Sequence, residues 1–254
     1  MAADLIDTAR LALACLDLTS LNEGDDARTT QALCAKALAA PGAIAAVCVW
    51  PRLVAQARAA LPPSLRVAAV ANFPHGALDR AVALADCAAI ADAAGDEIDL
   101  VLPWRAWATG ERQACAALVS AVRRAYPALT LKLILESGEL RDEALIASAS
   151  VMALDEGVDF LKTSTGKTAV SATPAAARTM LATIAAHTRR GDVGFKASGG
   201  IRTVADARLY IDLTHQALGT VTPRRFRIGA SALLDDIIAT LSSGAGAPPS
   251  SSTY

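Results

Sequence analysis

The stretch Val158-Asp-Phe-Leu-Lys-Thr-Ser-Thr-Gly-Lys167 has the pattern of a buried β-strand with a lysine inside it and a glycine-containing loop behind it. The stretch Val193-Gly-Phe-Lys-Ala-Ser-Gly-Gly200 repeats this arrangement, so Lys162 and Lys196 both stand within apolar strands. A lysine seldom enters an apolar interior, because desolvation is costly and drives the ammonium toward its neutral form. A neutral buried amine is a nucleophile. The two stretches therefore predict an amine-based enzyme that acts on a phosphorylated carbonyl compound.

Around these stretches, short runs rich in Val, Ile and Leu alternate with longer alanine-rich segments of helical periodicity, which is typical of βα units and a parallel sheet. Eight strands are expected, over residues 14–19, 44–50, 65–73, 97–103, 129–137, 158–165, 193–198 and 225–230. Eight strands, each followed by a helix, predict an α/β fold, the (β/α)8 TIM barrel. An additional N-terminal helix before the first strand is expected to close the bottom of the barrel.

The length of 254 residues suits one such barrel, which we expect over residues 1–243 as a single domain. Residues 244–254 are rich in Gly, Pro and Ser and predict a flexible C-terminal tail. A doubly wound open sheet is the alternative fold. It has little support as a dinucleotide-binding fold, because no Gly-x-Gly-x-x-Gly follows the first expected strand.

Composition narrows the classes of partner. The net charge is −1 with acids and bases interspersed, so we expect no nucleic acid and no anionic membrane as partner, but a small molecule. The five cysteines form no Cys-x-x-Cys pair, and the N-terminus carries acids where a signal peptide needs bases. We therefore expect a cytoplasmic protein. No metal set is apparent, since His75, His187 and His215 stand far from the expected carboxylate positions.

Side chains in a strand point alternately to opposite faces, so residues of equal parity share a face. In the expected strands, this rule separates a charged face from an apolar face that suits packing under helices. The charged face must then line the barrel interior, with at least three carboxylates beside three ammonium groups: Asp17, Asp99, Glu136, Lys132, Lys162 and Lys196. Such a set is either a structural ion-pair network or a catalytic cluster, and its place at strand ends favours function.

Three loops that follow the last strands predict a phosphate site. They contain Thr165-Gly166-Lys167, Gly199-Gly200 and Gly229-Ala230-Ser231. Glycine lets backbone N–H groups approach an anion, Lys167 adds a positive charge, and Ser231 stands where a helix begins. Each loop alone is an ordinary turn, but barrels commonly bind phosphate between these last loops.

With these residues placed, the chain resembles the deoxyribose-phosphate aldolases, a family of class I aldolases. The resemblance covers nearly the whole chain, and its Lys-Thr-Ser-Thr-Gly segment is highly specific. The motifs that carry it are Leu16-Asp-Leu-Thr19, Val47-Cys-Val-Trp-Pro-Arg52, Asn72-Phe-Pro-His-Gly76, Asp96-Glu-Ile-Asp-Leu-Val101, Glu136-Ser-Gly-Glu-Leu140, Asp159-Phe-Leu-Lys-Thr-Ser-Thr-Gly-Lys167, Gly194-Phe-Lys-Ala-Ser-Gly-Gly-Ile-Arg-Thr203 and Arg227-Ile-Gly-Ala-Ser231. It implies reversible cleavage of 2-deoxy-D-ribose 5-phosphate to acetaldehyde and D-glyceraldehyde 3-phosphate, without metal or other cofactor.

The resemblance also implies roles. Lys162 would form the Schiff base, Lys196 would lower its pKa, and Asp99 would move protons with bound water, while Asp17 and Lys132 support them. The phosphate would bind at Gly166, Lys167, Gly199, Gly200, Gly229 and Ser231. Ala232 departs from a Gly-Ala-Ser-Ser ending that is frequent in the family, which removes one hydroxyl. Tyr254 would assist proton transfer, as some members carry a C-terminal tyrosine; the alternative is a chain end without a role in the reaction.

Two other functions stay open at this point. The first is a different Schiff-base aldolase or transaldolase that takes a longer phosphosugar, because strand-end lysines recur in such barrels and a fold does not fix a substrate. The second is a catalytically silent barrel that binds a phosphorylated metabolite. The sequence does not fix the oligomeric state, for which a homodimer is one option.

Overall fold

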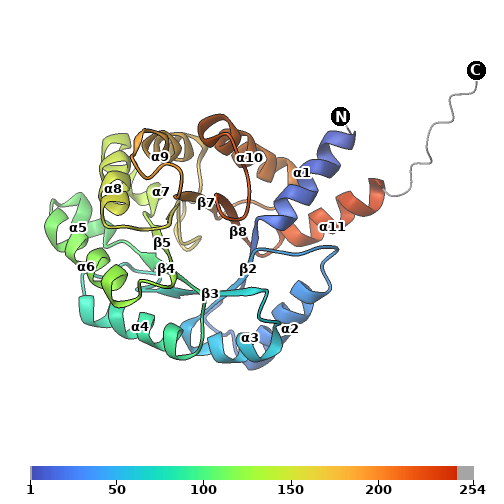
Figure 1. Ribbon diagram of the computed structural model, residues 1–254, viewed down its shortest axis with the longest axis horizontal. Coiled ribbons are helices and arrows are strands. Elements are labelled where there is room, and N and C mark those ends of the chain that lie inside the picture. Colours follow the sequence, from blue (N-terminus) through green and yellow to red (C-terminus); the bar gives the residue numbers. More distant parts are fainter. Residues whose placement is uncertain (1, 245–254) are drawn as a thin grey trace, which may run out of the picture.

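The computed structural model describes residues 2–244. Eight parallel strands form a closed barrel in which each strand pairs with the next and β8 pairs with β1 (Figure 1). The predicted TIM barrel is therefore confirmed. The strands are β1 (Leu16–Thr19), β2 (Ala46–Val49), β3 (Arg66–Ala71), β4 (Glu97–Val101), β5 (Thr130–Ile134), β6 (Phe160–Lys162), β7 (Gly194–Ser198) and β8 (Phe226–Ala230). Of the tail predicted over residues 244–254, Gly244 is the last residue of the final helix, and residues 245–254, Tyr254 included, lie outside the described residues.

Helices surround the barrel as an outer layer (Figure 1). They are α1 (Ala2–Ala14), α2 (Ala27–Leu38), the 3-10 turn η1 (Pro51–Leu53), α3 (Val54–Ala60), α4 (Arg80–Asp92), α5 (Trp104–Ala108), α6 (Arg112–Ala125), α7 (Ser137–Leu140), α8 (Glu143–Asp155), α9 (Pro174–Ala186), α10 (Val204–Leu218) and α11 (Leu233–Gly244). Side chains fix where several of them begin. Asp79 accepts from two backbone N–H groups of α4, and Thr173 accepts from one of α9.

The N-terminal helix α1 is present, but its predicted place is wrong. It packs in the outer layer against α10 and α11 and does not close the bottom of the barrel (Figure 1). Ala9 and Ala12 are fully buried, and Asp4 forms an ion pair with Arg208 of α10 at 2.7 Å. The alanine-rich face of α1 thus fits between two neighbouring helices, where small side chains permit close packing.

The eight expected strands all occur, although most are shorter than predicted. The fifth was expected to reach residue 137, yet β5 ends at Ile134 because Ser137 begins α7. Outward-facing apolar side chains of the strands, such as Leu16, Leu133 and Phe195, form one continuous core with the helices. Within residues 2–244, no helix is long and apolar enough to cross a membrane.

Candidate active site

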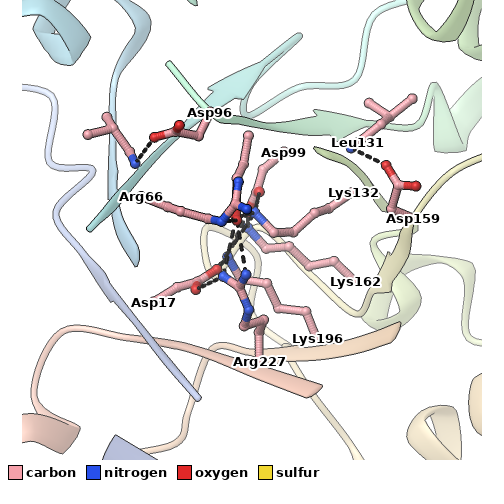
Figure 2. A network of polar contacts seen from close by, with 12 residues as sticks. Asp17, Arg66, Asp96, Asp99, Leu131, Lys132, Asp159, Lys162, Lys196 and Arg227 are labelled. Atoms are coloured by element: carbon pink, nitrogen blue, oxygen red, sulfur yellow. Dashed lines mark hydrogen bonds and ion pairs between the residues drawn. The ribbon is translucent and has the colours of Figure 1, made fainter. Parts of the chain in front are cut away.

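Three lysines on adjacent strands converge on one carboxylate inside the barrel. Lys132 of β5, Lys162 of β6 and Lys196 of β7 place their Nζ atoms 2.6, 2.7 and 2.8 Å from the carboxylate oxygens of Asp99 on β4 (Figure 2). The register explains the convergence, because Lys132 pairs with Asp99 across β4 and β5, and Lys162 pairs with Lys196 across β6 and β7. All four side chains are at most 2% exposed.

Further ion pairs extend this cluster. Lys196 Nζ lies 2.5 Å from Asp17 Oδ2, and the other oxygen of Asp17 accepts from Arg227 Nη1 at 2.6 Å. Arg227 also donates to both oxygens of Glu97, at 2.9 and 3.2 Å. We call the seven side chains the lysine network: Asp17, Glu97, Asp99, Lys132, Lys162, Lys196 and Arg227.

The lysine network holds more cations than anions. Four cationic side chains face three carboxylates when every group is charged, and Arg66, half-exposed at the edge, reaches Glu97 only at 3.7 Å. A buried surplus charge is costly, so one cation is expected to lose its proton. Among the described residues, Lys162 ion-pairs with one carboxylate, Asp99, whereas Lys132 and Lys196 each reach more than one. Lys162 is therefore the cation held least firmly.

The pKa directions agree with this geometry. Burial lowers the pKa of Lys162, and the positive charge of Lys196 adds to this effect, while Asp99 opposes it. Burial acts on Lys196 in the same way, but Asp17 and Asp99 outweigh it and raise its pKa. For Lys132, Asp99 and Glu97 likewise outweigh burial and raise the pKa. Lys162 is thus the lysine of the network whose pKa is shifted toward the neutral amine that a nucleophile needs.

Two carboxylates of the lysine network, Asp99 and Asp17, remain ionised. Burial alone would raise the pKa of Asp99, but the three lysines overcome it and hold that pKa well below its usual range. Asp17 follows the same pattern, because Lys196 and Arg227 outweigh its burial and lower its pKa. Both carboxylates therefore act on the lysines as fixed negative charges at neutral pH.

The side of the interior formed by β2 and β3 is apolar. Ala46, Cys48, Ala68 and Val70 cluster there with Leu21, all buried. The thiol of Cys48 is fully buried and lies within reach of the charges of Asp99 and the three lysines, so it faces the lysine network. Burial raises the pKa of the Cys48 thiol above that of a free thiol, so this thiol is neutral at physiological pH.

The predicted phosphate residues come together around one cavity of about 310 Å³ at the end of the strands. Its walls include all six of them: Gly166, Lys167, Gly199, Gly200, Gly229 and Ser231. Gly166, Gly199 and Gly200 have φ of 77°, 86° and 82°, a backbone shape that other residues seldom adopt. A Cβ at Gly229 would lie 2.6 Å from Ser198 Oγ and 3.1 Å from Lys196 Cε, so this glycine leaves room between the cavity and the lysine network.

Glu136 lies apart from the lysine network, contrary to the sequence prediction. Its backbone has left the strand and adopts φ 53°, so the parity rule no longer applies to it. Its carboxylate accepts from the backbone and hydroxyl of Thr165 and from the hydroxyl of Thr168. Burial raises its pKa, and the hydrogen bonds from Thr165 oppose that rise. Glu136 therefore organises the loop after β6 that lines the cavity.

Sequence reasoning missed two members of the lysine network. Arg227 was quoted only as part of a motif, although it shares the parity of Gly229 on β8. Glu97 shares the parity of Asp99 on β4, but it is missing from the carboxylates expected on the charged face. Figure 2 shows Arg227 reaching toward Asp17 from the strand opposite Asp99.

Comparison with known proteins agrees with this geometry. Residues 11–236 match the profile described as DeoC/LacD family aldolase. The chain belongs to this aldolase family. It is accordingly an enzyme, a carbon–carbon lyase. A deoxyribose-phosphate aldolase from Agrobacterium fabrum is 49% identical over 244 residues, which cover 94% of this chain and 93% of that relative.

Solved structures of the same shape include an apo crystal structure from Toxoplasma gondii ME49, provisionally assigned as a deoxyribose-phosphate aldolase. It has a TM-score of 0.86 and 26% identity, and the match covers 95% of this chain and 98% of the other. The deoxyribose phosphate aldolase of Aeropyrum pernix, described as having a unique tetrameric structure, has a TM-score of 0.72 over 97% of this chain and 99% of its own. At 22% identity, the second likeness concerns the fold alone.

Proposed function

We propose that this aldolase reversibly cleaves 2-deoxy-D-ribose 5-phosphate to acetaldehyde and D-glyceraldehyde 3-phosphate through a Schiff base on Lys162. One observation carries the proposal: the amine of Lys162 is buried, bonded to Asp99 at 2.7 Å, and has a lowered pKa, while the glycine-lined cavity lies just beyond it along the same strands. A neutral nucleophile and an anion site at this spacing suit a short sugar with an aldehyde at one end and a phosphate at the other.

The chemistry follows from these groups. The Lys162 amine adds to the aldehyde carbon, and loss of water leaves an iminium ion. A base takes the proton of the 3-hydroxyl, the bond between C2 and C3 breaks, and its electron pair moves into the iminium to give an enamine. D-Glyceraldehyde 3-phosphate leaves. A proton then adds to the enamine carbon, and water hydrolyses the new iminium to acetaldehyde and free Lys162.

Asp99 is suited to pass these protons with a water molecule. While Lys162 is neutral, Asp99 has one charged lysine fewer beside it, which makes it more basic than in the fully protonated network. Lys196 keeps its proton between Asp17 and Asp99, and so presents a fixed positive charge next to the iminium site. Asp17 and Lys132 hold these partners in place.

The cavity residues support the phosphate assignment. Backbone N–H groups near Gly166, Gly199 and Gly200 lie in loops of positive φ, and Lys167 adds a cation at the wall. The residue after Ser231 is Ala232, which directly precedes α11 and brings a backbone N–H but no hydroxyl to the cavity wall. We further propose a cytoplasmic enzyme, in line with its five buried free thiols. The homodimer stays a prediction.

A product assay tests the proposal. The protein is incubated with 2-deoxy-D-ribose 5-phosphate, and acetaldehyde and D-glyceraldehyde 3-phosphate are quantified separately, with unphosphorylated 2-deoxyribose and a six-carbon phosphosugar in parallel. We expect equal amounts of both products from the five-carbon phosphate and much less turnover of the other two sugars. Preference for the longer phosphosugar would support a different Schiff-base aldolase, and binding without cleavage would support a silent barrel.

A further inference from the structure

Arg227 is the cation of the lysine network to which the proposed mechanism assigns no role. It is 5% exposed and holds Asp17 through Nη1 at 2.6 Å, while its two Nη atoms contact the two oxygens of Glu97. A guanidinium presents its donors as a rigid planar fork and does not release its proton in proteins. Its charge is therefore permanent, unlike that of a lysine.

We propose that Arg227 is a positioning residue of the reaction, which supplies the surplus positive charge that keeps the Lys162 amine unprotonated. This inference rests on the proposed role of Lys162 as the nucleophile. Arg227 acts at a distance, through Asp17 and the buried charge balance, and no contact with the substrate is needed.

The charge balance gives the reason. With Arg227 present, four cations face three carboxylates, and the least firmly held amine gives up its proton. Without Arg227, three lysines would face Asp17, Glu97 and Asp99, and all three could remain charged. Arg227 also orients Asp17, whose second oxygen lies 2.5 Å from Lys196 Nζ. Loss of the guanidinium would thus release negative charge toward the lysines and favour a protonated Lys162.

Two thiols and one carboxylate also lie near these two residues. Burial raises the pKa of Cys48 on β2, and it raises the pKa of Cys15, which directly precedes β1, to about 12. Glu136 follows β5 in the chain, and its carboxylate accepts hydrogen bonds from the hydroxyls of Thr165 and Thr168. The charged groups that face Lys162 or Arg227 from β1, β4, β5 and β7 are Asp17, Glu97, Asp99, Lys132 and Lys196. The pKa directions of Asp17, Asp99, Lys132 and Lys196 all favour the charged form, so Lys162 is the lysine whose proton is expected to respond.

The packing around Arg227 allows its charge to be removed while its apolar contact is kept. The Arg227 guanidinium carbon lies 5.5 Å from the ring centroid of Phe160, and that ring occupies the space beside Gly194, where a Cβ would come within 2.2 Å of it. Methionine has an unbranched stem of similar length, so Arg227→Met keeps apolar contact with Phe160 and removes the charge. Arg227→Lys keeps the charge and loses the fork. Arg224, exposed three residues away, offers a matched control because solvent screens its charge.

The experiment measures how borohydride trapping depends on pH. Each variant is mixed with 2-deoxy-D-ribose 5-phosphate and borohydride between pH 5 and 10, and the fraction of reduced adduct is read by intact mass. For Arg227→Met, we expect the midpoint to rise by about one pH unit, with trapping about tenfold slower at pH 7. Arg227→Lys should restore most of the shift, and Arg224→Met should cause none.

A second substitution restores the surplus of positive charge in the network by removing one carboxylate. Arg227→Met combined with Glu97→Gln leaves three cations and two carboxylates, so the midpoint should return toward that of the wild type. An unchanged midpoint in Arg227→Met, with lower thermal stability, would overturn the inference and leave Arg227 a structural residue. If Arg227→Met does not fold, Glu97→Gln alone should lower the midpoint, and a rise would overturn the inference. Absence of any adduct in the wild-type enzyme would instead refute the proposed function.

Discussion

The two sides of the barrel interior differ in what they offer a buried lysine. The strands β4 to β8 and β1 supply the lysine network, in which almost every charge meets an opposite charge. The strands β2 and β3 supply small apolar side chains, among them Ala46, Ala68 and Val70, together with Cys48. In the ring of eight strands, β2 lies opposite β6, which carries Lys162. Lys162 thus extends from the charged side toward the apolar one.

In the proposed mechanism, this difference separates the lysine that acts as nucleophile from the neighbour that keeps its proton. Lys162 and Lys196 are paired in register, equally buried, and bonded to the same oxygen of Asp99. Lys196 has Asp17 as a further partner, and the apolar side gives Lys162 no comparable one among residues 2–244. Since pairing raises and burial lowers the pKa of a lysine, one additional carboxylate separates the two roles.

The largest effect is expected when the nucleophile is replaced by a cation that cannot lose its proton. Lys162→Arg should abolish turnover, because a guanidinium stays protonated and forms no Schiff base. Product release from 2-deoxy-D-ribose 5-phosphate measures this, with Arg224→Met as a control for general effects of substitution. Retained turnover in Lys162→Arg would remove Lys162 from the mechanism.

A smaller loss of turnover is expected when Asp99, at the centre of the charged side, is replaced. Asp99→Asn should slow turnover by about 10²- to 10⁴-fold, the usual range for loss of a proton-transfer group. Sugar-phosphate binding should change little, since Asp99 does not line the cavity wall. Steady-state kinetics separates the two effects as a fall in kcat at similar KM. Near-normal kcat would reduce Asp99 to an ion-pair partner.

A carboxylate placed on the apolar side tests whether the lack of charge there controls the pKa of Lys162. Cys48→Asp would give Lys162 an additional carboxylate, and the surplus cation of the network would keep that carboxylate ionised. The pKa of Lys162 should rise, so less free amine is present at neutral pH, and the rate optimum should move to higher pH by about one unit. Cys48→Asn, of nearly equal shape and without charge, should leave the optimum in place. Equal optima in the two variants would show that the apolar side does not control Lys162.

Much of this site could be predicted from the sequence, because the period of a strand is simple. Alternation alone placed Asp17, Asp99 and the three lysines on the interior face, and the structure brings all five together. The glycine-rich loops followed their strands in the same way and meet around one cavity. Their chemical roles stay predictions.

The remaining features depend on geometry that local pattern does not contain. Glu136 has the parity of Lys132, but it stands beyond the end of β5 and turns toward Thr165. Arg227 follows Arg224 and Arg225 in a basic run that looks solvated, and only closure of β8 against β1 brings it to Asp17. The inward direction of Cys48 likewise depends on how β2 pairs with its neighbouring strands.

The most direct test of this account asks which lysine carries the Schiff base. The enzyme is reduced with borohydride in the presence of 2-deoxy-D-ribose 5-phosphate, digested, and mapped by peptide mass. Lys162 and Lys196 lie in different peptides, because Arg178, Arg189 and Arg190 separate them. We expect a stable adduct on the peptide that contains Lys162 and an unmodified Lys196. An adduct on Lys196 would contradict it, since the lysine with two close carboxylate partners would then be the neutral one.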